Sequence, residues 1–477
     1  MRRNKSNRAH EALLASGLPR HPCESQTESD MKFDLLIRGV TAFVGRDFKR
    51  IDDCDIGVKG QRIIQITSGI PDSAGSRVID AGDMFATPGF VNAHFHPAQQ
   101  MNRAVARDNG HSHHMDILHA SDRVKKSSDT EALAYIAFLE ALHAGTTTFQ
   151  CVGSNVDSYI GAISAIGLRA CCVPILKDLT DESKDKLLRA EHRVTEDCLS
   201  RAEEIYKRYH DDRVRIHFGV VNVRYASDAL IQGMRELARR YQVGFHLHAA
   251  ESCEYVANVV ARTGRSPIQH LKALDSLDSE VSLAHAVHLT DSDIRVLASS
   301  GSHVVHCPRA NSYLSVGCCP VLDLLRAGVT VALGSDAAIN NNSNEVRGEA
   351  RAARDKLADR HGHDGLLGTT TLFSMLTTEG AKAMRLNDAG SLAVGNYADI
   401  VLWSKNDLPF VPGFDLLADL IFTDSCRAHT VIVDGEVILD DYRCRKVVEE
   451  DLIRQARLAA TEYHLRLCHL LADTLRQ

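Results

Sequence analysis

Residues 87–97 read TPGFVNAHFHP, and this stretch indicates how the rest of the chain is organised. It opens with a Pro-Gly turn, continues through a short apolar run of strand-forming residues and ends in a His-x-His pair. Because side chains alternate along a strand, His94 and His96 are expected on the same face. Two imidazoles that converge from one strand end can bind a divalent metal ion. Such a pair is common on ordinary strands, so further ligands must come from elsewhere in the chain.

The composition is that of an ordinary globular protein. The chain has 477 residues, of which 44% are hydrophobic and 25% charged, which suits one large domain and a smaller one. A net charge of −7 without a basic stripe makes nucleic acid an unexpected partner. The sequence contains no apolar run of about 18 residues, so a membrane partner is not expected either.

The cysteines indicate a reducing compartment. The 13 cysteines are scattered, include no C-x-x-C motif and accompany no secretory signal. Free thiols in a cytoplasmic protein are therefore the expected state.

The pattern of the sequence divides the chain into a few parts. Residues 1–30 are polar, and a disordered extension is expected there. Short alternating runs at 31–86 return at 387–445, which predicts one small composite β-domain built from both ends of the chain. It encloses a long insert at 87–386, and the tail at 446–477 has a helical pattern.

The insert alternates short buried strands with longer helical segments. Eight such units in succession predict an α/β fold, a (β/α)8 TIM barrel, rather than an open doubly wound sheet. No Gly-rich dinucleotide fingerprint follows any strand, which also argues against the Rossmann alternative. The predicted strands are FVNAHF (90–95), TTTFQCV (146–152), RACCVPI (169–175), RVRIHFGVV (213–221), VGFHLHA (243–249), VSLAHAV (281–287), SHVVHC (302–307) and VTVALGS (329–335). Predicted helices include 129–144, 227–241, 291–299 and 320–327.

In a barrel of this kind, functional groups project from the C-terminal ends of the strands. The fifth predicted strand ends at His248 with Glu251 just beyond it, the sixth ends near His285, and Asp336 follows the eighth. Each residue alone has an ordinary explanation, as a hydrogen-bonded core histidine or a helix N-cap. Together with the His-x-His pair they predict a metal site at the mouth of the barrel.

Several motifs carry a family resemblance. In chain order they are PGFVNAHFH, HLHAAES, LAHAVHLTDSDIRVLASSG, HVVHCPRANSYLSVGCCPVLDLLRAGVTVALGSDAAINNN and ADIVLW. From about residue 32 to about residue 440 the chain thereby resembles the amidohydrolase superfamily. The likeness is to the branch of cytosine-, guanine- and S-adenosylhomocysteine-type deaminases and triazine hydrolases. It implies a (β/α)8 barrel with a flanking composite β-sandwich, a small-molecule substrate and a homo-oligomer.

The resemblance also implies the metal ligands. His94, His96 and His248 match ligand positions, and Asp336 matches the fourth protein ligand or a close neighbour of the metal. The fourth predicted strand lacks the lysine that binuclear members carbamylate, which favours one divalent metal ion. Three imidazoles and a carboxylate favour Zn²⁺, with Fe²⁺ as the alternative.

Catalytic roles follow from the same resemblance. Glu251 matches the acid that binds the substrate ring and shuttles a proton, and His285 matches the residue that orients the attacking water. Asp336 is expected to take the proton of that water. His246 matches no ligand position and is expected in the core.

The loop after the first barrel strand departs from the pattern of the relatives and is expected over the barrel mouth, where specificity is set. Polar side chains there could hydrogen-bond a substrate, although a solvated loop explains them equally well. The candidate substrate-binding residues are Gln99, Gln100, Asn102, Arg103 and Asn311.

The leading hypothesis is a metal-dependent aminohydrolase that releases ammonia from an aminated heterocycle. A second reading keeps the site and changes the leaving group to chloride, an alkylamine, or the product of amide or carbamate cleavage. A third is a non-catalytic scaffold, which the retention of every site residue argues against.

Overall fold

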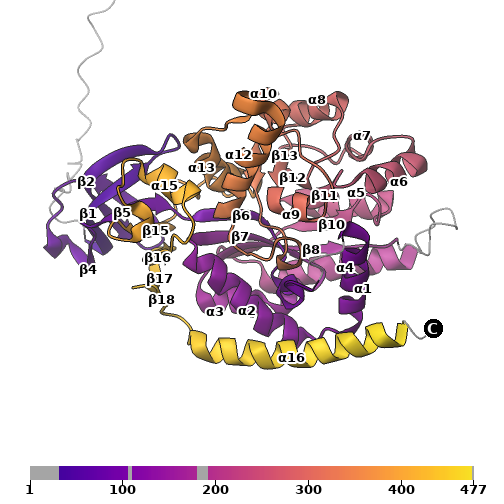
Figure 1. Ribbon diagram of the computed structural model, residues 1–477, viewed down its shortest axis with the longest axis horizontal. Coiled ribbons are helices and arrows are strands. Elements are labelled where there is room, and N and C mark those ends of the chain that lie inside the picture. The colour runs from indigo at the N-terminus through magenta and orange to yellow at the C-terminus, as the bar shows by residue number, and fades with distance from the viewer. Residues whose placement is uncertain (1–31, 106–109, 180–191, 475–477) are drawn as a thin grey trace, which may run out of the picture.

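A barrel of parallel strands forms the centre of the computed structural model, which describes residues 32–105, 110–179 and 192–474. The predicted extension at 1–30 lies outside the described residues. The strands follow one another around the barrel in chain order, and this confirms the predicted (β/α)8 fold (Figure 1). They are β6 (Phe90–Phe95), β7 (Thr146–Gly153), β8 (Arg169–Leu176), β10 (Phe218–Asn222), β11 (Phe245–Ala249), β12 (Val281–His285), β13 (His303–His306) and β14 (Val331–Leu333).

The predicted fourth strand is divided in two. β9 (Val214–Ile216) pairs with β8, and β10 pairs with both β8 and β11. The division falls at His217, whose N–H donates to the carbonyl of Cys172 at 2.9 Å, while the next N–H, of Phe218, donates to Gly244 at 3.1 Å on the other side. The chain changes its hydrogen-bonding partner at this point, which sequence periodicity could not indicate.

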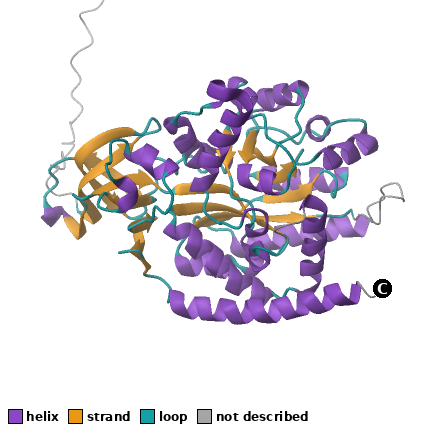
Figure 2. Ribbon diagram, viewed as in Figure 1, coloured by secondary structure: helices purple, strands orange, loops and turns teal. Residues whose placement is uncertain are grey.

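Helices surround the barrel (Figures 1 and 2). The four predicted helices correspond to α2, α5, α8 and α10 within two residues at each end. Helix α5 illustrates why its bounds could be predicted. The hydroxyl of Ser227 accepts a hydrogen bond from the N–H of Leu230 and so starts the helix, and apolar side chains at helical spacing face inward. The helices of this part of the chain are α1 (Gly110–Val124), α2 (Ser127–His143), α3 (Ile160–Ile166), α4 (His192–Tyr209), α5 (Asp228–Arg240), α6 (Cys253–Thr263), α7 (Pro267–Ala273), α8 (Asp291–Ser300), α9 (Pro308–Tyr313), α10 (Val321–Arg326), α11 (Ala338–Asn341), α12 (Arg347–His361), α13 (Thr369–Leu376) and α14 (Thr378–Ala383), with the 3₁₀ helix η3 (Pro97–Asn102) after β6.

A second sheet combines strands from both ends of the chain. Its order is β18-β17-β16-β15-β5-β1-β2-β3, with β4 beside β1. The two halves join where Pro88 pairs with Ile400, one residue before the turn that leads into β6. The buried indole of Trp403 donates to the hydroxyl of Thr87 at 2.9 Å, so this junction fixes the start of the first barrel strand. The strands are β1 (Phe33–Val44), β2 (Lys49–Lys59), β3 (Arg62–Thr67), β4 (Gly75–Asp80), β5 (Met84–Pro88), β15 (Ile400–Ser404), β16 (Thr430–Val433), β17 (Glu436–Asp440) and β18 (Arg443–Cys444), and α15 (Leu416–Phe422) lies between β15 and β16.

The tail forms one long helix, α16 (Glu449–Thr474), which packs on the outside against α1 and α2 (Figure 1). Its residue Tyr463 is buried, and the hydroxyl of Tyr463 hydrogen-bonds to the side chains of Asn102 and Ser121. The end of the chain therefore supports the segment that follows the first barrel strand.

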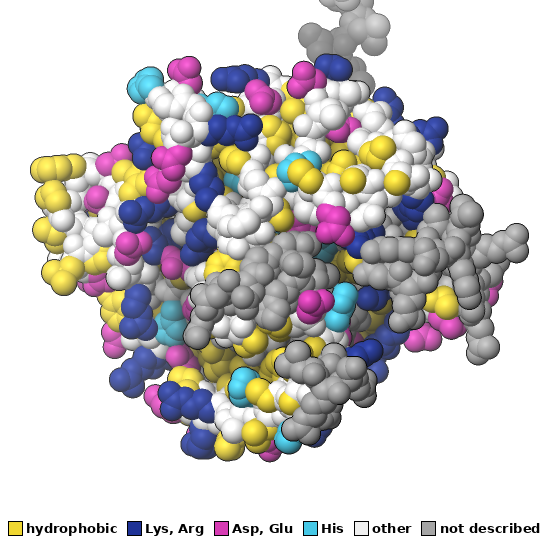
Figure 3. All heavy atoms as spheres, turned by 45° about the vertical axis from the view of Figure 1, so that its right-hand side comes forward, with side chains coloured by type: hydrophobic (Ala, Val, Ile, Leu, Met, Phe, Trp, Pro, Cys, Tyr) yellow, Lys and Arg dark blue, Asp and Glu magenta, His cyan; other side chains and the backbone are white. Residues whose placement is uncertain are grey.

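Charged side chains of both signs are interspersed over the described surface drawn in Figure 3. Within the described residues, every helix is too short or too polar to serve as a membrane span.

Candidate metal centre

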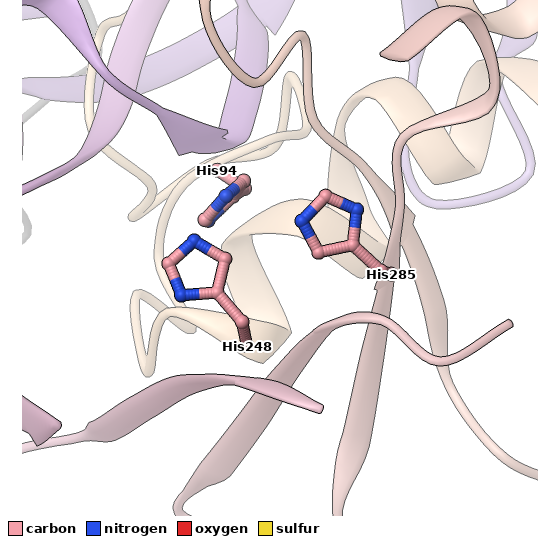
Figure 4. A group of neighbouring side chains, drawn as sticks. All are labelled: His94, His248 and His285. Carbon is pink, nitrogen blue, oxygen red and sulfur yellow. The ribbon is translucent and has the colours of Figure 1, made fainter. Parts of the chain in front are cut away.

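Side chains from several strand ends meet at one mouth of the barrel. His94 lies near the end of β6 and His96 directly follows that strand. His248 comes from β11, His285 is the last residue of β12, and Asp336 lies in the turn after β14. Figure 4 shows the imidazoles of His94, His248 and His285 turned toward one another. The structure thus brings together the residues that the sequence placed at strand ends.

The donor atoms of this cluster lie close enough to share one cation. The Nε2 atom of His96 lies 3.2 Å from His94 Nε2 and 3.3 Å from His248 Nε2. Asp336 Oδ1 lies 3.5 Å from the Nε2 atoms of both His94 and His96. Two overlapping groups of three, one with His285 and one with Asp336, each have their donors within 4.8 Å of one another.

Burial keeps these imidazoles in the form that binds metals. Burial, and then the imidazoles of His248 and His285, hold the pKa of His94 well below its usual value. Burial and the adjacent His94 do the same for the pKa of His96. Neutral imidazoles with converging lone pairs beside a buried carboxylate fit a divalent metal ion, whose charge would offset their mutual repulsion. The site is therefore one for a divalent metal.

Two of the rings make hydrogen-bond contacts outside the cluster. His248 Nδ1 donates to the carbonyl of Val221 at 2.7 Å, which leaves Nε2 free to ligate. His94 Nδ1 lies 2.9 Å from Nε2 of His246, a residue that the sequence assigned to the core. The two-residue spacing from His248 along β11 was the available signal, because it places both histidines on one face of the strand.

A second group of residues faces the same centre. His285 Nε2 lies 3.9 Å from Glu251 Oε1 and 4.0 Å from Asp336 Oδ2. Burial lowers the pKa of His285, but Glu251 and Asp336 outweigh it and the net shift is upward. Asn311 Oδ1 lies 2.9 Å from His285 Nδ1, and Asn340 Nδ2 donates to Asp336 Oδ2 at 2.6 Å. Asn311, predicted to bind substrate, therefore contacts the site through His285.

The backbone is strained where the strands end at this centre. Ala250, His285, Ala286 and Asp336 all have positive φ, between 47° and 72°. Left-handed backbone at a non-glycine residue costs about 1–3 kcal/mol, and it persists at functional sites where neighbouring contacts enforce it. Here the N–H groups of Ala286 and Asp336 donate to barrel carbonyls at 3.0 and 2.9 Å.

A cavity of about 280 Å³ opens beside His96. Its walls come from η3, α1 and the ends of β7, β8 and β10, and they mix apolar groups with hydroxyl, amide and charged side chains. The residues that line it are His96, Ala98, Gln99, Asn102, Leu118, His119, Ser121, Asp122, Lys125, Val152, Gly153, Ser154, Asn155, Ile175, Leu176, Lys177, Val221 and Tyr225.

The candidate substrate-binding residues after β6 divide into two pairs. Gln99 and Asn102 line the cavity, whereas Gln100 and Arg103 do not. Gln100 Oε1 accepts a hydrogen bond from Asn344 at 3.0 Å, and Arg103 forms an ion pair with Glu140. Gln100 is buried and Arg103 is partly exposed, and both side chains bond to other parts of the protein, so we assign them to support of the loop.

Comparisons with known proteins identify the family of the chain. The profile described as "Amidohydrolase family" matches residues 85–438. The 5-methylthioadenosine/S-adenosylhomocysteine deaminase of Moorella thermoacetica is 32% identical over 385 residues, which are 79% of this chain and 87% of that protein. The enzyme of the same name from Pyrococcus abyssi is 29% identical over 89% of this chain and 98% of its own length. The 5'-deoxyadenosine deaminase of Methanosarcina acetivorans is 29% identical over 81% of this chain and 88% of its own length.

Solved structures share the fold. A zinc complex of the atrazine chlorohydrolase of Arthrobacter aurescens superposes with a TM-score of 0.83 at 24% identity, over 89% of this chain and 100% of that one. A zinc-bound adenosine deaminase of Xanthomonas campestris superposes with a TM-score of 0.82 at 24% identity, over 91% of this chain and 99% of that one. The profile match and the 32% identity across most of both chains show that this protein belongs to the amidohydrolase family.

Proposed function

We propose that this chain is a zinc-dependent aminohydrolase that removes the amino group of an adenosine derivative as ammonia. One observation carries the proposal. His285 Nε2 lies within 4.0 Å of carboxylate oxygens of both Glu251 and Asp336, beside the metal donors. The names of the similar deaminases support the substrate class.

The residues that would hold the metal are His94, His96, His248 and Asp336. Three imidazole nitrogens and one carboxylate oxygen suit Zn²⁺ in a catalytic site, with Fe²⁺ as the alternative. A bound divalent ion supplies Lewis acidity, which lowers the pKa of a water molecule from 15.7 to about 7.

The remaining groups of the site move protons. His285 Nε2, held in place by Asn311 at its other nitrogen, orients the attacking water. Asp336 Oδ2, 4.0 Å from His285, accepts one proton of that water and returns it to the departing nitrogen. Glu251 donates a proton to the ring nitrogen next to the reacting carbon and later recovers it from the new hydroxyl group. The water oxygen thus becomes bonded to the carbon, the carbon–nitrogen bond breaks, and ammonia leaves.

The cavity beside His96 accommodates the rest of the substrate. Gln99 and Asn102 line it from the segment after β6, and Ser154 and Asn155 line it from the segment after β7. The amides of Gln99 and Asn155 and the hydroxyl of Ser154 can hydrogen-bond sugar hydroxyls, while Val152 and Ile175 supply apolar contact.

The test is metal analysis followed by an ammonia-release assay. Purified protein is expected to contain about one equivalent of zinc and to release ammonia from adenosine, 5'-deoxyadenosine or 5'-methylthioadenosine, with loss of activity after chelation and recovery after zinc addition. Cytosine, guanine and chlorinated or alkylamino triazines form the comparison arms. Turnover of a triazine alone would replace deamination with the other leaving groups, and metal-loaded protein without any turnover would overturn the enzymatic assignment.

We also propose a cytoplasmic homo-oligomer without nucleic-acid or membrane partners. The described cysteines are all free, which supports a reducing compartment. Gel filtration with light scattering tests the oligomeric state.

A further inference from the structure

A buried hydrogen-bonded chain extends from the metal centre into the barrel. His94 Nδ1 lies 2.9 Å from His246 Nε2, and His246 Nδ1 lies 2.7 Å from the hydroxyl oxygen of Ser282 on the neighbouring strand β12. All three residues are at most 2% exposed. Strand pairing sets the last contact, because His246 and Ser282 are directly opposite each other between β11 and β12.

The positions of the protons along this chain follow from the role of His94. Its Nε2 atom faces His96 Nε2 at 3.2 Å and Asp336 Oδ1 at 3.5 Å, so a ligating His94 must be unprotonated there and must carry its proton on Nδ1. That proton can only be donated to His246 Nε2, which must then be the acceptor. His246 therefore carries its own proton on Nδ1 and donates it to Ser282. Each ring has one orientation and one tautomer that satisfy every contact.

We infer that His246 is a positioning residue of the metal centre, which holds the ring and tautomer of His94 through its own hydrogen bond to Ser282. This inference rests on the proposed metal ligands, and it assigns a role in the metal site to a histidine that the motif analysis placed in the core. The reverse proton arrangement would put a hydrogen on His94 Nε2 and exclude it as a ligand. Outer partners of this kind change metal affinity or activity by about 10- to 100-fold when they are lost.

Two substitutions of His246 separate the hydrogen bond from the packing. His246→Leu fills much of the space but offers no acceptor to His94, whereas His246→Gln can present its amide oxygen near the position of Nε2. The leucine variant is expected to lose zinc to a chelator about 10- to 100-fold faster than wild type, and the glutamine variant to stay within about threefold. Ser282→Ala, which removes only the outer acceptor, is expected to give an intermediate rate.

The control is a buried histidine at the other end of the barrel. His303 begins β13 and its ring contacts the carbonyl of Ser279, so His303→Leu removes a comparable buried group without approaching the metal. Its metal loss is expected at the wild-type rate.

If His246→Leu does not fold, the glutamine and Ser282→Ala variants are measured alone, and equal zinc loss in Ser282→Ala and wild type then overturns the inference. Zinc loss at the wild-type rate from a folded His246→Leu, or equal loss from the leucine and glutamine variants, also overturns it. Because the readout is metal retention, a failure of the deaminase assignment leaves this test intact.

Discussion

Phe95 and Asp336 are paired in a short parallel bridge that closes the seam of the barrel. The N–H of Asp336 donates to the carbonyl of His94 at 2.9 Å, and its carbonyl accepts from the N–H of His96 at 3.0 Å. These two backbone hydrogen bonds hold the Cα atom of Asp336 beside those of His94 and His96, whatever rotamers the side chains adopt. In this arrangement Asp336 has a φ of 60°, a left-handed backbone conformation that is strained for a non-glycine residue.

Asp336→Asn is expected to abolish turnover while the protein stays folded. Asparagine tolerates the left-handed backbone at this position and keeps the shape of the side chain, but it cannot accept the proton of the water. We expect kcat to fall by about 10²- to 10⁴-fold, which is the usual contribution of a general base. A steady-state assay with a melting curve measures both effects, and a near-normal rate would refute the proton-transfer role.

Asn340→Ala is expected to lower kcat by about tenfold with little change in KM. Its amide donates to Asp336 Oδ2 at 2.6 Å and so keeps Oδ1 facing the imidazoles. Asn340→Ser, which retains a short donor, should restore part of the rate. Asn396→Ala serves as the matched control, because that amide binds Ser391 in a loop close to the second sheet. A loss of rate in the control equal to that in Asn340→Ala would mean that the effect is not local.

Tyr463→Phe is expected to raise KM and leave kcat near the wild-type value. The hydroxyl of this α16 residue bonds to Asn102 and Ser121, which both line the cavity, while the reacting groups lie elsewhere. Loss of a buried hydrogen bond should also lower the free energy of unfolding by about 1–2 kcal/mol. Tyr442→Phe removes a hydroxyl that bonds to Asp407 beside the second sheet, and its KM should not change.

Acid is expected to destabilise the protein partly through His217. Burial, followed by Arg215 and Arg385, lowers the pKa of His217 to about 3. Because the pKa in the unfolded chain is about 6.5, the unfolded state takes up a proton first, and stability falls between pH 6.5 and 3 while it is unaffected above that range. The contribution is about 1.4 kcal/mol per pH unit. Denaturant titrations at pH 7 and pH 5 should show a smaller pH effect in His217→Leu than in wild type; equal pH effects would contradict this assignment.

Much of the site could be predicted because its residues stand at the ends of short buried strands. The period-two pattern and the strand–helix alternation place His94, His248, His285 and Asp336 at one end of a barrel without knowledge of any contact. The family motifs then assigned their expected roles.

The contacts that could not be predicted join residues far apart in the chain. The 3₁₀ turn after β6 directs Gln100 and Arg103 toward Asn344 and Glu140, and no local pattern distinguishes them from Gln99, which faces the cavity. Tyr463, on the last helix, bonds to Asn102 in the same segment after β6. Such pairings depend on tertiary packing, which periodicity does not encode.

The sheet built from both ends of the chain has a consequence for biosynthesis. β5, which leads directly into the first ligand-bearing strand, pairs with β15, and the ribosome makes β15 only after the whole barrel. The seam between Phe95 and Asp336 likewise joins the first barrel strand to the last. During translation the histidines of β6 therefore emerge long before the partners that hold them, so a nascent chain or a truncated product ending before β15 cannot assemble the complete support of the metal site.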